Sequence, residues 1–410
     1  MNLLYIGCLY SELDKELFLN ASRRGYQYAS QNLQEAIIEG LLCNNENFSV
    51  ITIPSLSSYP FGNKLVKIKD SAFVYQDHQL GNSFGYLNIR FLRRVPMKKV
   101  DAAIRQWIGY GEKPRRVIVY GMHPRLMAIA AKIKTIDPET KLCIIIPDLP
   151  EYMGENWLLE KLGHRTKKKE KAYSLLQFFD SFAVLAEGMI EKIPVSRPYV
   201  VVEGMYRGEI EVRNNSVDSK EKIIMYSGGL HSRYGIIDLL QAFRLIHDPN
   251  YRLWLCGTGD SVPIIKENIE KDNRIQYLGS LPSDKVRDLQ QRATLLINPR
   301  HSNEEFTRYS FPSKTIEYLA SGTPVLMSHL PCIPSEYDDY LFYFRDESLE
   351  GMRDAIIDVC SKKSSDLKDR GLKAQSFIRK QKTPKSQVNK ILKLLSSLDN
   401  KDNINNTSVY

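Results

Sequence analysis

Arg308-Tyr-Ser-Phe-Pro-Ser-Lys-Thr-Ile-Glu-Tyr-Leu-Ala-Ser-Gly-Thr-Pro-Val-Leu326 is the stretch that decides the fold of this chain. It predicts a short helix that runs directly into a buried strand. Pro312 suits the first helical turn, because its missing N–H would have no partner there. Gly322 is placed to end the helix, and Pro324 prevents its continuation.

The predicted helix has two faces of different chemistry. At about 100° per residue, an apolar face is shared by Ile316, Leu319 and Ala320, and a polar face by Ser313, Lys314, Glu317 and Ser321. The polar face begins at the helix N-terminus, where backbone N–H groups, a hydroxyl and an ammonium suit phosphate oxygens and the carboxylate suits a sugar diol. An ordinary amphipathic helix with a solvated face gives the same pattern.

Length and composition indicate a globular protein of two domains. At 410 residues the chain is too long for one ordinary core, and its 43% hydrophobic and 26% charged residues are typical of soluble proteins. No apolar run approaches the roughly 18 residues of a membrane span, and the first residues predict a strand rather than a signal peptide. The six cysteines form no CxxC or Cys/His cluster, which favours small core residues in a reducing cytoplasm over disulfides or a metal site.

The net charge of +9 is concentrated in two basic runs of the first half, from Arg90 to Lys99 and from His164 to Lys171. Such runs are often solvated faces. The alternatives are contact with an anionic membrane, here the inner face of the plasma membrane, or with an anionic substrate. Nucleic acid is disfavoured, because no nucleic-acid-binding motif accompanies the charge.

Short apolar runs alternate with helical patterns along both halves of the chain. In the first half we predict strands at 3–6, 48–53, 116–120, 142–146, 181–185 and 199–202, and helices at 28–43 and 124–133. Residues 54–100 are less regular and predict loops. In the second half we predict strands at 222–226, 251–256, 275–278, 294–298 and 324–327, and helices at 235–245, 262–272, 283–291, 348–362, 364–381 and 386–398.

This alternation predicts the α/β class, with two Rossmann-like doubly wound domains facing across a ligand cleft. The predicted domains are residues 1–206 and 207–382. Residues 383–400 are predicted as a helix that packs back toward the first domain, and residues 401–410 as a disordered tail.

Three strand-to-loop junctions of the second half are candidates for an anion site. They lie at residues 226–235, 255–260 and 298–301, and they carry Gly228, Gly229 and Arg233, then Gly257 and Gly259, and finally Arg300. Paired glycines let backbone amides approach a diphosphate, and an arginine can pair with it bidentately. A turn explains any one glycine pair, but successive strand ends of one domain favour a phosphate site. The first strand lacks G-x-G-x-x-G, which disfavours a dinucleotide dehydrogenase.

These motifs resemble the GT-B glycosyltransferases, specifically the retaining family 4 (group 1) and its bacterial surface-polysaccharide branch. Residues 227–243 resemble the family's first nucleotide loop and helix, and residues 311–326 resemble its donor-binding helix. In that family the second glutamate of a Glu-x7-Glu pair grips the nucleotide ribose, and Glu317 occupies its position. The first glutamate, which contacts the donor sugar, is replaced by Tyr309, with Glu304 or Glu305 as substitutes at another spacing.

Other positions also depart from the family pattern. Gly229 and Tyr234 stand where the family has arginine and lysine on the diphosphate, so phosphate binding would move to Arg233, Lys314 and Arg308. Where relatives often have a histidine near the reacting sugar, this chain offers Asp148.

The resemblance implies transfer of a sugar from a nucleotide-diphosphate sugar, with a UDP-sugar favoured, to a hydroxyl of a lipid-linked glycan. The configuration would be retained, and no metal or other cofactor is expected. The first domain would bind the acceptor and the second the donor. The implied catalytic residues are Asp148, Lys314 and Arg233, and the implied donor-binding residues are Gly228, Gly229, Gly257, Gly259, Arg300, Tyr309, Ser310, Phe311, Pro312, Ser313 and Glu317.

Three other functions compete with this one. Tyr309 in place of glutamate keeps open a catalytically inactive GT-B scaffold or regulator of a polysaccharide-synthesis complex. A sugar-nucleotide 2-epimerase shares the two-domain architecture and would form its product without an acceptor. A nicotinamide enzyme is the weakest alternative.

Overall fold

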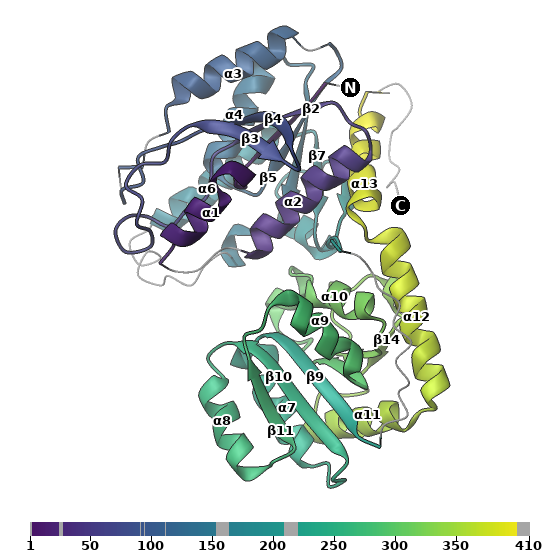
Figure 1. The fold of residues 1–410 in the computed structure, drawn as a ribbon. Helices are drawn as coiled ribbons and strands as arrows, with labels where there is room; N and C mark the ends of the chain where they lie inside the picture. The colour runs from purple at the N-terminus through teal and green to yellow at the C-terminus, as the bar shows by residue number, and fades with distance from the viewer. Residues whose placement is uncertain are drawn as a thin grey trace. The chain divides into compact units, whose positions relative to one another are not determined.

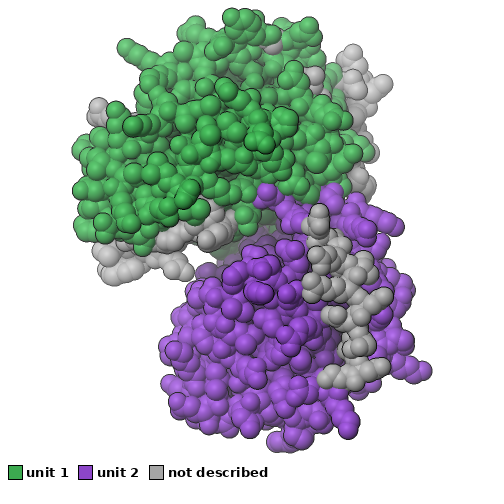
Figure 2. All heavy atoms as spheres, in the orientation of Figure 1, with its two compact units in different colours: residues 1–202, 384–410 green, residues 203–383 purple. Residues whose placement is uncertain are grey.

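The computed structural model describes residues 2–23, 28–90, 92–93, 95–110, 112–152, 164–208 and 220–399. The chain forms two compact units, unit 1 (residues 1–202 and 384–410) and unit 2 (residues 203–383), which Figure 2 colours green and purple. Each unit has its own sheet and its own core. The predicted tail at 401–410 lies outside the described residues, as do residues 209–219 of the polar stretch between the predicted domains.

Unit 1 is built on an eight-stranded sheet in the order β3-β4-β2-β1-β5-β6-β7-β8. Figure 1 labels β2, β3, β4, β5 and β7 of this sheet. Only the β3–β4 pair is antiparallel. The strands are β1 (Asn2–Gly7), β2 (Phe48–Thr52), β3 (Ser71–Tyr75), β4 (His78–Ser83), β5 (Arg115–Tyr120), β6 (Lys141–Ile146), β7 (Ser181–Val184) and β8 (Tyr199–Val201). The strand order reverses between β1 and β5, and ligands of such sheets bind beyond the strand ends at this switch point.

Helices cover the faces of this sheet, so its central strands are buried on both sides and read as continuous apolar runs. The helices are α1 (Glu12–Ala21), α2 (Tyr28–Cys43), α3 (Met97–Tyr110), α4 (Pro124–Ile136) and α6 (His164–Leu175). The 3-10 turns are η1 (Pro150–Tyr152), η2 (Leu176–Phe178) and η3 (Glu187–Lys192). The predicted strands and the helices at α2 and α4 are confirmed, with ends that differ by at most three residues.

Residues 54–100, predicted as loops, contain a β-hairpin and the start of a helix. The hairpin turns at Gln76 and Asp77, whose φ values of 47° and 62° are left-handed. Such turns usually carry Asn-Gly or Asp-Gly, so Gln-Asp gave no hairpin signal. The helix α1 was also not predicted, and in the structure its Leu13 and Leu17 are exposed.

The C-terminal helix α13 (Pro384–Ser397) packs against α2 within unit 1. Gly40 of α2 permits this close packing, because a Cβ there would lie 2.4 Å from Val388 Cγ2. At the other end of α13, the buried Arg116 of β5 donates from Nη1 to Ser396 Oγ over 3.0 Å. The helix is therefore part of the packing of unit 1.

Unit 2 has a six-stranded, wholly parallel sheet in the order β11-β10-β9-β12-β13-β14. The strands are β9 (Lys222–Gly229), β10 (Tyr251–Thr258), β11 (Ile275–Gly279), β12 (Leu295–Asn298), β13 (Val325–Met327) and β14 (Leu341–Tyr343). Its strand order reverses between β9 and β12. The strand β14 was not predicted, since three residues are too few to show a period.

The helices of unit 2 confirm the predicted alternation. They are α7 (Ile236–Arg244), α8 (Val262–Lys271), α9 (Ser283–Arg292), α10 (Lys314–Ser321), α11 (Leu349–Ser361) and α12 (Ser364–Gln381), with 3-10 turns η4 (Ser232–Tyr234), η5 (Glu305–Arg308) and η6 (Ser335–Tyr337). Their apolar faces and the strands between them form a core that includes Ile224, Leu239, Phe243, Leu253 and Leu326. Among the described residues, no helix is both long enough and apolar enough to cross a bilayer.

Candidate functional site

The glycines predicted to bind an anion gather at the switch point of unit 2. β9 ends in Ser227-Gly228-Gly229, and its neighbour β10 ends at Gly257 and Thr258, paired in register with Gly228 and Gly229. A Cβ on Gly257 would lie 1.8 Å from the carbonyl oxygen of Gly228, and its φ of 138° is open only to glycine without strain. The two strand ends therefore meet backbone to backbone, as a loop that cradles a phosphate requires.

The next glycine on this edge fixes the loop that follows β9. A Cβ on Gly259 would lie 2.1 Å from the carbonyl oxygen of Leu230. The adjacent Asp260 accepts a hydrogen bond of 2.8 Å from the amide of Ser232, and this bond is the main cause that lowers the pKa of its carboxyl. The loops after β9 and β10 thus hold each other.

Tyr318 of α10 ties the helix to the end of β9. Its hydroxyl accepts from the amide of Ser227 over 2.8 Å and donates to the carbonyl of the same residue over 3.0 Å. Gln290 of α9 adds a bond of 2.9 Å from Nε2 to Ser227 Oγ. The position of α10 relative to the glycine loop is therefore fixed by buried hydrogen bonds, which tolerate little displacement.

The structure corrects two details of the predicted helix. It begins at Lys314 rather than at Pro312, whose carbonyl instead closes a turn by accepting from the amide of Thr315 over 2.8 Å. Ser321, assigned to the polar face, is buried and donates to the carbonyl of Tyr318 over 2.6 Å. Gly322 ends the helix in the left-handed conformation, with φ of 79°, as predicted.

Lys314 and Glu317 are the two charged groups that α10 presents at this edge. Lys314 Nζ lies 2.6 Å from Glu317 Oε2, and both side chains remain partly exposed. The lysine reaches over the glycine loop, because a Cβ on Gly228 would lie 3.6 Å from Lys314 Cε. An ammonium carries three donors, so this one can keep Glu317 and still contact an anion held by the loop.

Arg300 follows β12, on the other side of the switch point, and its guanidinium lies among aromatic rings. The guanidinium carbon is 4.5 Å from the ring centre of Tyr234 and 5.3 Å from that of Phe306. Its Nε and Nη1 are buried, and within the described ranges neither has a hydrogen-bond partner. Burial lowers the pKa of Arg300. Buried donors of a cation are costly when unpaired, so this group is suited to receive an anion.

Gly235 brings Tyr234 next to Arg300. Its φ of 75° is left-handed, and a Cβ there would lie 2.0 Å from the carbonyl oxygen of Pro299. The loop before α7 can therefore lie directly on the end of β12. Arg233 is exposed and also contacts this tyrosine, with its guanidinium carbon 5.0 Å from the ring centre and Nη2 3.1 Å from the hydroxyl.

The segment from Tyr309 to Ser313 connects η5 to α10. Tyr309 and Phe311 are buried, and the ring of Phe311 lies 5.7 Å from that of Tyr337. The carbonyl of Ser310 accepts from Cys332 Sγ over 3.5 Å, and Ser313 is exposed at the helix entrance. Within this segment the aromatic side chains serve packing, and the exposed hydroxyl of Ser313 stands beside the first-turn amides of α10.

A buried ion cluster supports this segment from behind. Lys382 Nζ lies 3.0 Å from Glu203 Oε2 and 2.6 Å from Glu336 Oε1, and it is 4.8 Å from the ring centre of Tyr337. The Lys382 side chain is 1% exposed. Because Tyr337 contacts both Lys382 and Phe311, the cluster gives the loop before α10 a rigid base.

Asp148, the remaining predicted site residue, belongs to unit 1. It follows β6, next to the switch point of the unit 1 sheet. Asp148 is an exposed residue, yet desolvation by the surrounding protein raises the pKa of its carboxyl to about 6. His123, which follows β5, was not predicted. Burial and the nearby Lys168 lower its pKa, so its imidazole is neutral at pH 7.

Sequence reasoning also missed a second cluster in unit 2, formed by Asp238, His301 and Glu347. These residues come from three separate elements. Their distance along the chain left no signal of contact, although His301 directly follows Arg300. His301 itself lies in the junction at residues 298–301 that was predicted to border the anion site, at a strand end of the same sheet edge.

The comparisons with known proteins agree with this geometry. Residues 221–362 match the family described as glycosyl transferases group 1. Among solved structures, Anabaena HepE in complex with UDP has a TM-score of 0.62 and 13% identity, covering 97% of this chain and 100% of that one. The fold is that of the GT-B glycosyltransferases.

Two other solved structures share the fold. Sucrose-phosphate synthase from Thermosynechococcus elongatus has a TM-score of 0.61 and 14% identity, covering 97% of this chain and 99% of that one. The lipopolysaccharide outer core galactosyltransferase WaaB has a TM-score of 0.60 and 13% identity, covering 97% and 100%. No curated protein matches the chain in sequence. The family match supports a glycosyltransferase domain in unit 2, and the structural likenesses establish the fold.

Proposed function

We propose that unit 2 binds a nucleotide-diphosphate sugar and that the protein transfers the sugar to a glycan hydroxyl with retained configuration. The observation that carries this proposal is Arg300, a half-buried cation at the switch point of unit 2 whose Nε and Nη1 are buried without a hydrogen-bond partner among the described residues. A diphosphate offers the acceptors that Arg300 lacks. The match of residues 221–362 to the group 1 glycosyltransferases supports the same ligand.

The proposed donor site divides its work among three kinds of group. Backbone amides of the Gly228–Gly229 loop and of the α10 entrance would bind the diphosphate, and Lys314 and Arg300 would balance its charge. Glu317 would accept from the ribose hydroxyls. As the sugar leaves, negative charge grows on the diphosphate, and fixed cations stabilise that charge without rearrangement. Because Lys314 and Arg300 supply this positive charge, we propose that the reaction is independent of metal ions.

A UDP-sugar is the donor that the relatives favour. Solved structures of Anabaena HepE contain UDP, UDP with glucose, and UDP-glucose. A structure of TarM from S. aureus contains UDP together with alpha-GlcNAc-glycerol. These ligands belong to those proteins, and they support the choice of UDP as the first nucleotide to test here.

Thermal unfolding with UDP, GDP, ADP, dTDP and NAD tests the donor site. A ligand at about 100 times its dissociation constant stabilises a protein by roughly 2.7 kcal/mol, enough for a clear upward shift. We expect a shift with UDP that is lost in Arg300→Met and reduced in Lys314→Ala and Glu317→Ala. Lys373→Ala, which replaces an exposed lysine of unit 2 that pairs with Asp369 on its own helix, is the matched control. A UDP shift that survives Arg300→Met would refute the assignment of Arg300.

Unit 1 is the proposed acceptor domain, with Asp148 as the group that binds the acceptor hydroxyl. Asp148 and His123 stand at the ends of neighbouring strands of the parallel sheet. Lys168 of α6 acts on His123 closely enough to lower its pKa, which brings part of the second basic run to this edge. A cation there favours an anionic acceptor, such as a lipid-diphosphate-linked glycan of bacterial polysaccharide synthesis.

The two basic runs are also the proposed contact with an anionic membrane, and they differ in how free they are. In the first run, Arg93 donates to the Leu56 carbonyl and to the Ser58 and Asn88 side chains, and Lys99 pairs with Asp70. In the second run, Lys167 and Lys168 are exposed, whereas Lys169 pairs with Glu151. Replacing Lys167, Lys168 and Lys169 by Glu should abolish binding to vesicles that contain phosphatidylserine. Unchanged binding would refute membrane contact through α6.

A non-catalytic scaffold is the second candidate, and Tyr309 is the observation that favours it. This residue is 6% exposed, so its side chain packs inside unit 2 instead of offering a carboxylate to a donor sugar. A protein that binds UDP but hydrolyses no UDP-sugar and glycosylates no acceptor would support the scaffold. Slow hydrolysis of one UDP-sugar would favour the enzyme.

A further inference from the structure

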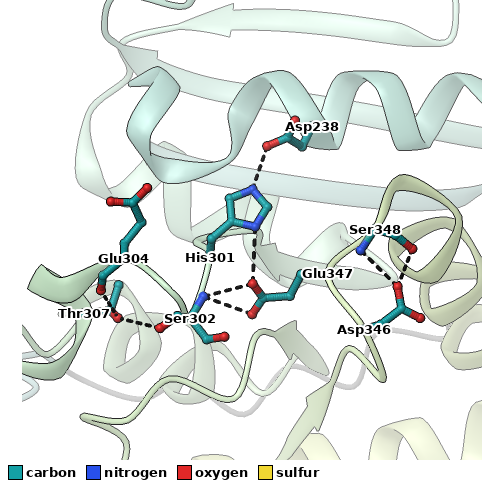
Figure 3. A network of polar contacts seen from close by, with 8 residues as sticks. All are labelled: Asp238, His301, Ser302, Glu304, Thr307, Asp346, Glu347 and Ser348. Carbon is teal, nitrogen blue, oxygen red and sulfur yellow. Dashed lines mark hydrogen bonds and ion pairs between the residues drawn. The ribbon is translucent and has the colours of Figure 1, made fainter.

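His301 bridges two carboxylates of unit 2 that take no part in the proposed donor contacts. Its Nε2 lies 2.6 Å from Asp238 Oδ2 and its Nδ1 lies 3.3 Å from Glu347 Oε2 (Figure 3). Asp238 belongs to the first turn of α7, and Glu347 to the loop before α11. The imidazole therefore links three segments of unit 2, namely the segment that follows β12, the first turn of α7 and the loop before α11.

The contacts define the protonation state of His301. An ionised carboxylate only accepts hydrogen bonds, so each ring nitrogen that faces one must donate. Both nitrogens donate only in the imidazolium form. A neutral ring would turn a lone pair toward Asp238 or Glu347 and would leave the two carboxylates without the cation between them. A carboxylate on each ring nitrogen therefore favours the charged ring.

The charged groups around His301 agree with this state. Asp238 faces it from α7 and Glu347 from the loop before α11, and Arg300 precedes it in its own segment. Burial alone would lower the pKa of His301, but the hydrogen bonds and charges of Asp238 and Glu347 outweigh burial and raise it. Glu347 is likewise desolvated, yet hydrogen bonds from Ser302, Ser328 and His301 lower its pKa.

The network anchors the segment that carries Arg300. The Ser302 amide donates to both oxygens of Glu347 over 3.0 Å. Thr307 Oγ1 then donates to the carbonyls of Ser302 and Glu304 over 3.2 and 2.6 Å (Figure 3). Phe306, within the turn closed by Thr307, lies against the Arg300 guanidinium. A change at His301 can therefore affect Arg300 in two ways. One is directly along the backbone, because the two residues are adjacent, and the other is through the ring of Phe306.

We propose that His301, as the imidazolium, is a positioning residue that holds residues 300–308 in the conformation that binds the donor, so that donor affinity falls when the ring loses its proton. The inference rests on the proposed donor site. It adds a group that touches no substrate and acts through Arg300. The ring contributes fully below its ordinary pKa of about 6.5, and because its folded pKa is raised, the contribution is lost only as the pH rises through that higher value.

The dissociation constant of UDP, measured by titration calorimetry from about pH 7 to about pH 9.5, tests this role. We expect UDP binding to weaken about tenfold or more across this range in the wild-type protein, a change of about 1.4 kcal/mol. His301→Gln should bind weakly at every pH and lose this dependence. Asp238→Asn keeps a hydrogen-bond acceptor but removes the charge, and should move the transition to lower pH by about one unit or more. His247→Gln, an exposed histidine of unit 2, should behave as the wild type.

A second measurement, on the free protein, separates this inference from the proposed function. The ring of His301 is titrated by NMR, and hydrogen exchange of residues 302–312 is followed over the same pH range after correction for intrinsic rates. We expect exchange to accelerate as the ring deprotonates, and to be fast at all pH values in His301→Gln. Unchanged exchange through the ring titration would overturn the positioning role. Failure of UDP to bind at any pH, with this exchange transition intact, would overturn the donor site and leave the anchoring established.

If UDP binds with the same affinity before and after the His301 ring titrates, the network is merely structural and the inference fails. The Asp238→Asn variant guards against a trivial result. A pH dependence that arose elsewhere would not move when Asp238 loses its charge. A transition that moves in Asp238→Asn but not in His247→Gln assigns it to His301.

Discussion

The two units differ in how they hold the loop that follows the first strand of each sheet, at the switch point. In unit 2 the chain leaves its first strand through glycines, so that backbone meets backbone at Gly228 and Gly257. In unit 1 the chain leaves β1 without such a pair, and two glutamines of α2 hold the loop with their side chains. Gln34 Oε1 accepts from the Cys8 amide and Gln31 Oε1 from the Tyr10 amide, each over 2.9 Å.

This difference predicts what each edge can bind. Amides of a glycine loop are free to donate to a phosphate, and Arg300 and Lys314 add fixed charge. In unit 1 the corresponding amides of Cys8 and Tyr10 are already used by the glutamines. Its edge instead carries Asp148 and His123, whose pKa values are both displaced toward the neutral form. The edge of unit 2 is suited to bind a charged phosphate group, and the edge of unit 1 to form hydrogen bonds with a hydroxyl.

The sharpest way to break the comparison is Gly257→Ala. The new Cβ would lie 1.8 Å from the Gly228 carbonyl oxygen, so the ends of β9 and β10 must separate. We expect UDP binding to weaken by more than about 100-fold, or roughly 2.7 kcal/mol, measured by calorimetry on protein whose folding is checked by circular dichroism.

Gly279→Ala is the matched control for this change. Gly279 also has a left-handed φ, of 70°, but a Cβ there would meet nothing within 4 Å. It should cost about 1 kcal/mol of stability through backbone strain alone and leave UDP binding unchanged. Equal binding by Gly257→Ala and the wild type would contradict the view that the close approach of the strands forms the donor site.

The counterpart in unit 1 is Gln34→Leu. It leaves the Cys8 amide buried without an acceptor, and we expect it to lower the free energy of unfolding by about 1–3 kcal/mol. Gln79→Leu, on the exposed face of β4, should change it by no more than about 0.5 kcal/mol. Urea denaturation measures both. Because Gln34 serves unit 1 only, its loss should leave UDP affinity as it was, and a parallel loss of UDP binding would end the distinction between the two edges.

Much of the fold follows from local pattern. Most strands of the two sheets are short apolar runs, and the helices between them have ordinary lengths. Hydrophobic periodicity and the glycines and prolines that end each element therefore locate them. The exceptions are physical. The elements that were not predicted are the hairpin of β3 and β4, which turns on Gln76 and Asp77, the short strand β14, and the helices α1, α3 and α6. In these places tertiary contacts decide the conformation, and a local pattern carries no record of them.

Less of the candidate site than of the fold could be predicted from the sequence. Gly228, Gly257, Arg300, Lys314 and Glu317 could be named because strand ends and helix starts are visible in the sequence. The sequence did not show which of these side chains contact one another in the folded chain. The contact of Lys314 with the glycine loop, the hold of Tyr318 on Ser227 and the bridge from Asp238 through His301 to Glu347 all join residues that the chain keeps far apart. Each arises from the packing of a helix on the sheet.

The smallest expected effect is that of Asp148→Asn, and it tests the edge of unit 1. Asp148 has a folded pKa raised to about 6, so its protonated form is favoured and its contribution to stability is lost as the pH rises from its ordinary value toward about 6. Replacement by Asn should therefore stabilise the protein above pH 6 and have no effect below about pH 4. Because Asp148 is an exposed residue, we expect a gain of no more than about 1 kcal/mol.

Asp137→Asn is the control of opposite sign in the same unit. Burial opposes its charge, but hydrogen bonds from Thr140 and Arg115 prevail and lower its pKa. Its contribution is present above its ordinary pKa and is lost as the pH falls, so Asn should destabilise at pH 7 and matter less in acid. Melting temperatures measured between about pH 4 and pH 8 compare the two variants. If Asp148→Asn gains stability above pH 6 but loses sugar transfer while UDP affinity is kept, the residue is retained at a cost in stability for the acceptor. If transfer is unchanged, the edge of unit 1 has no part in the chemistry.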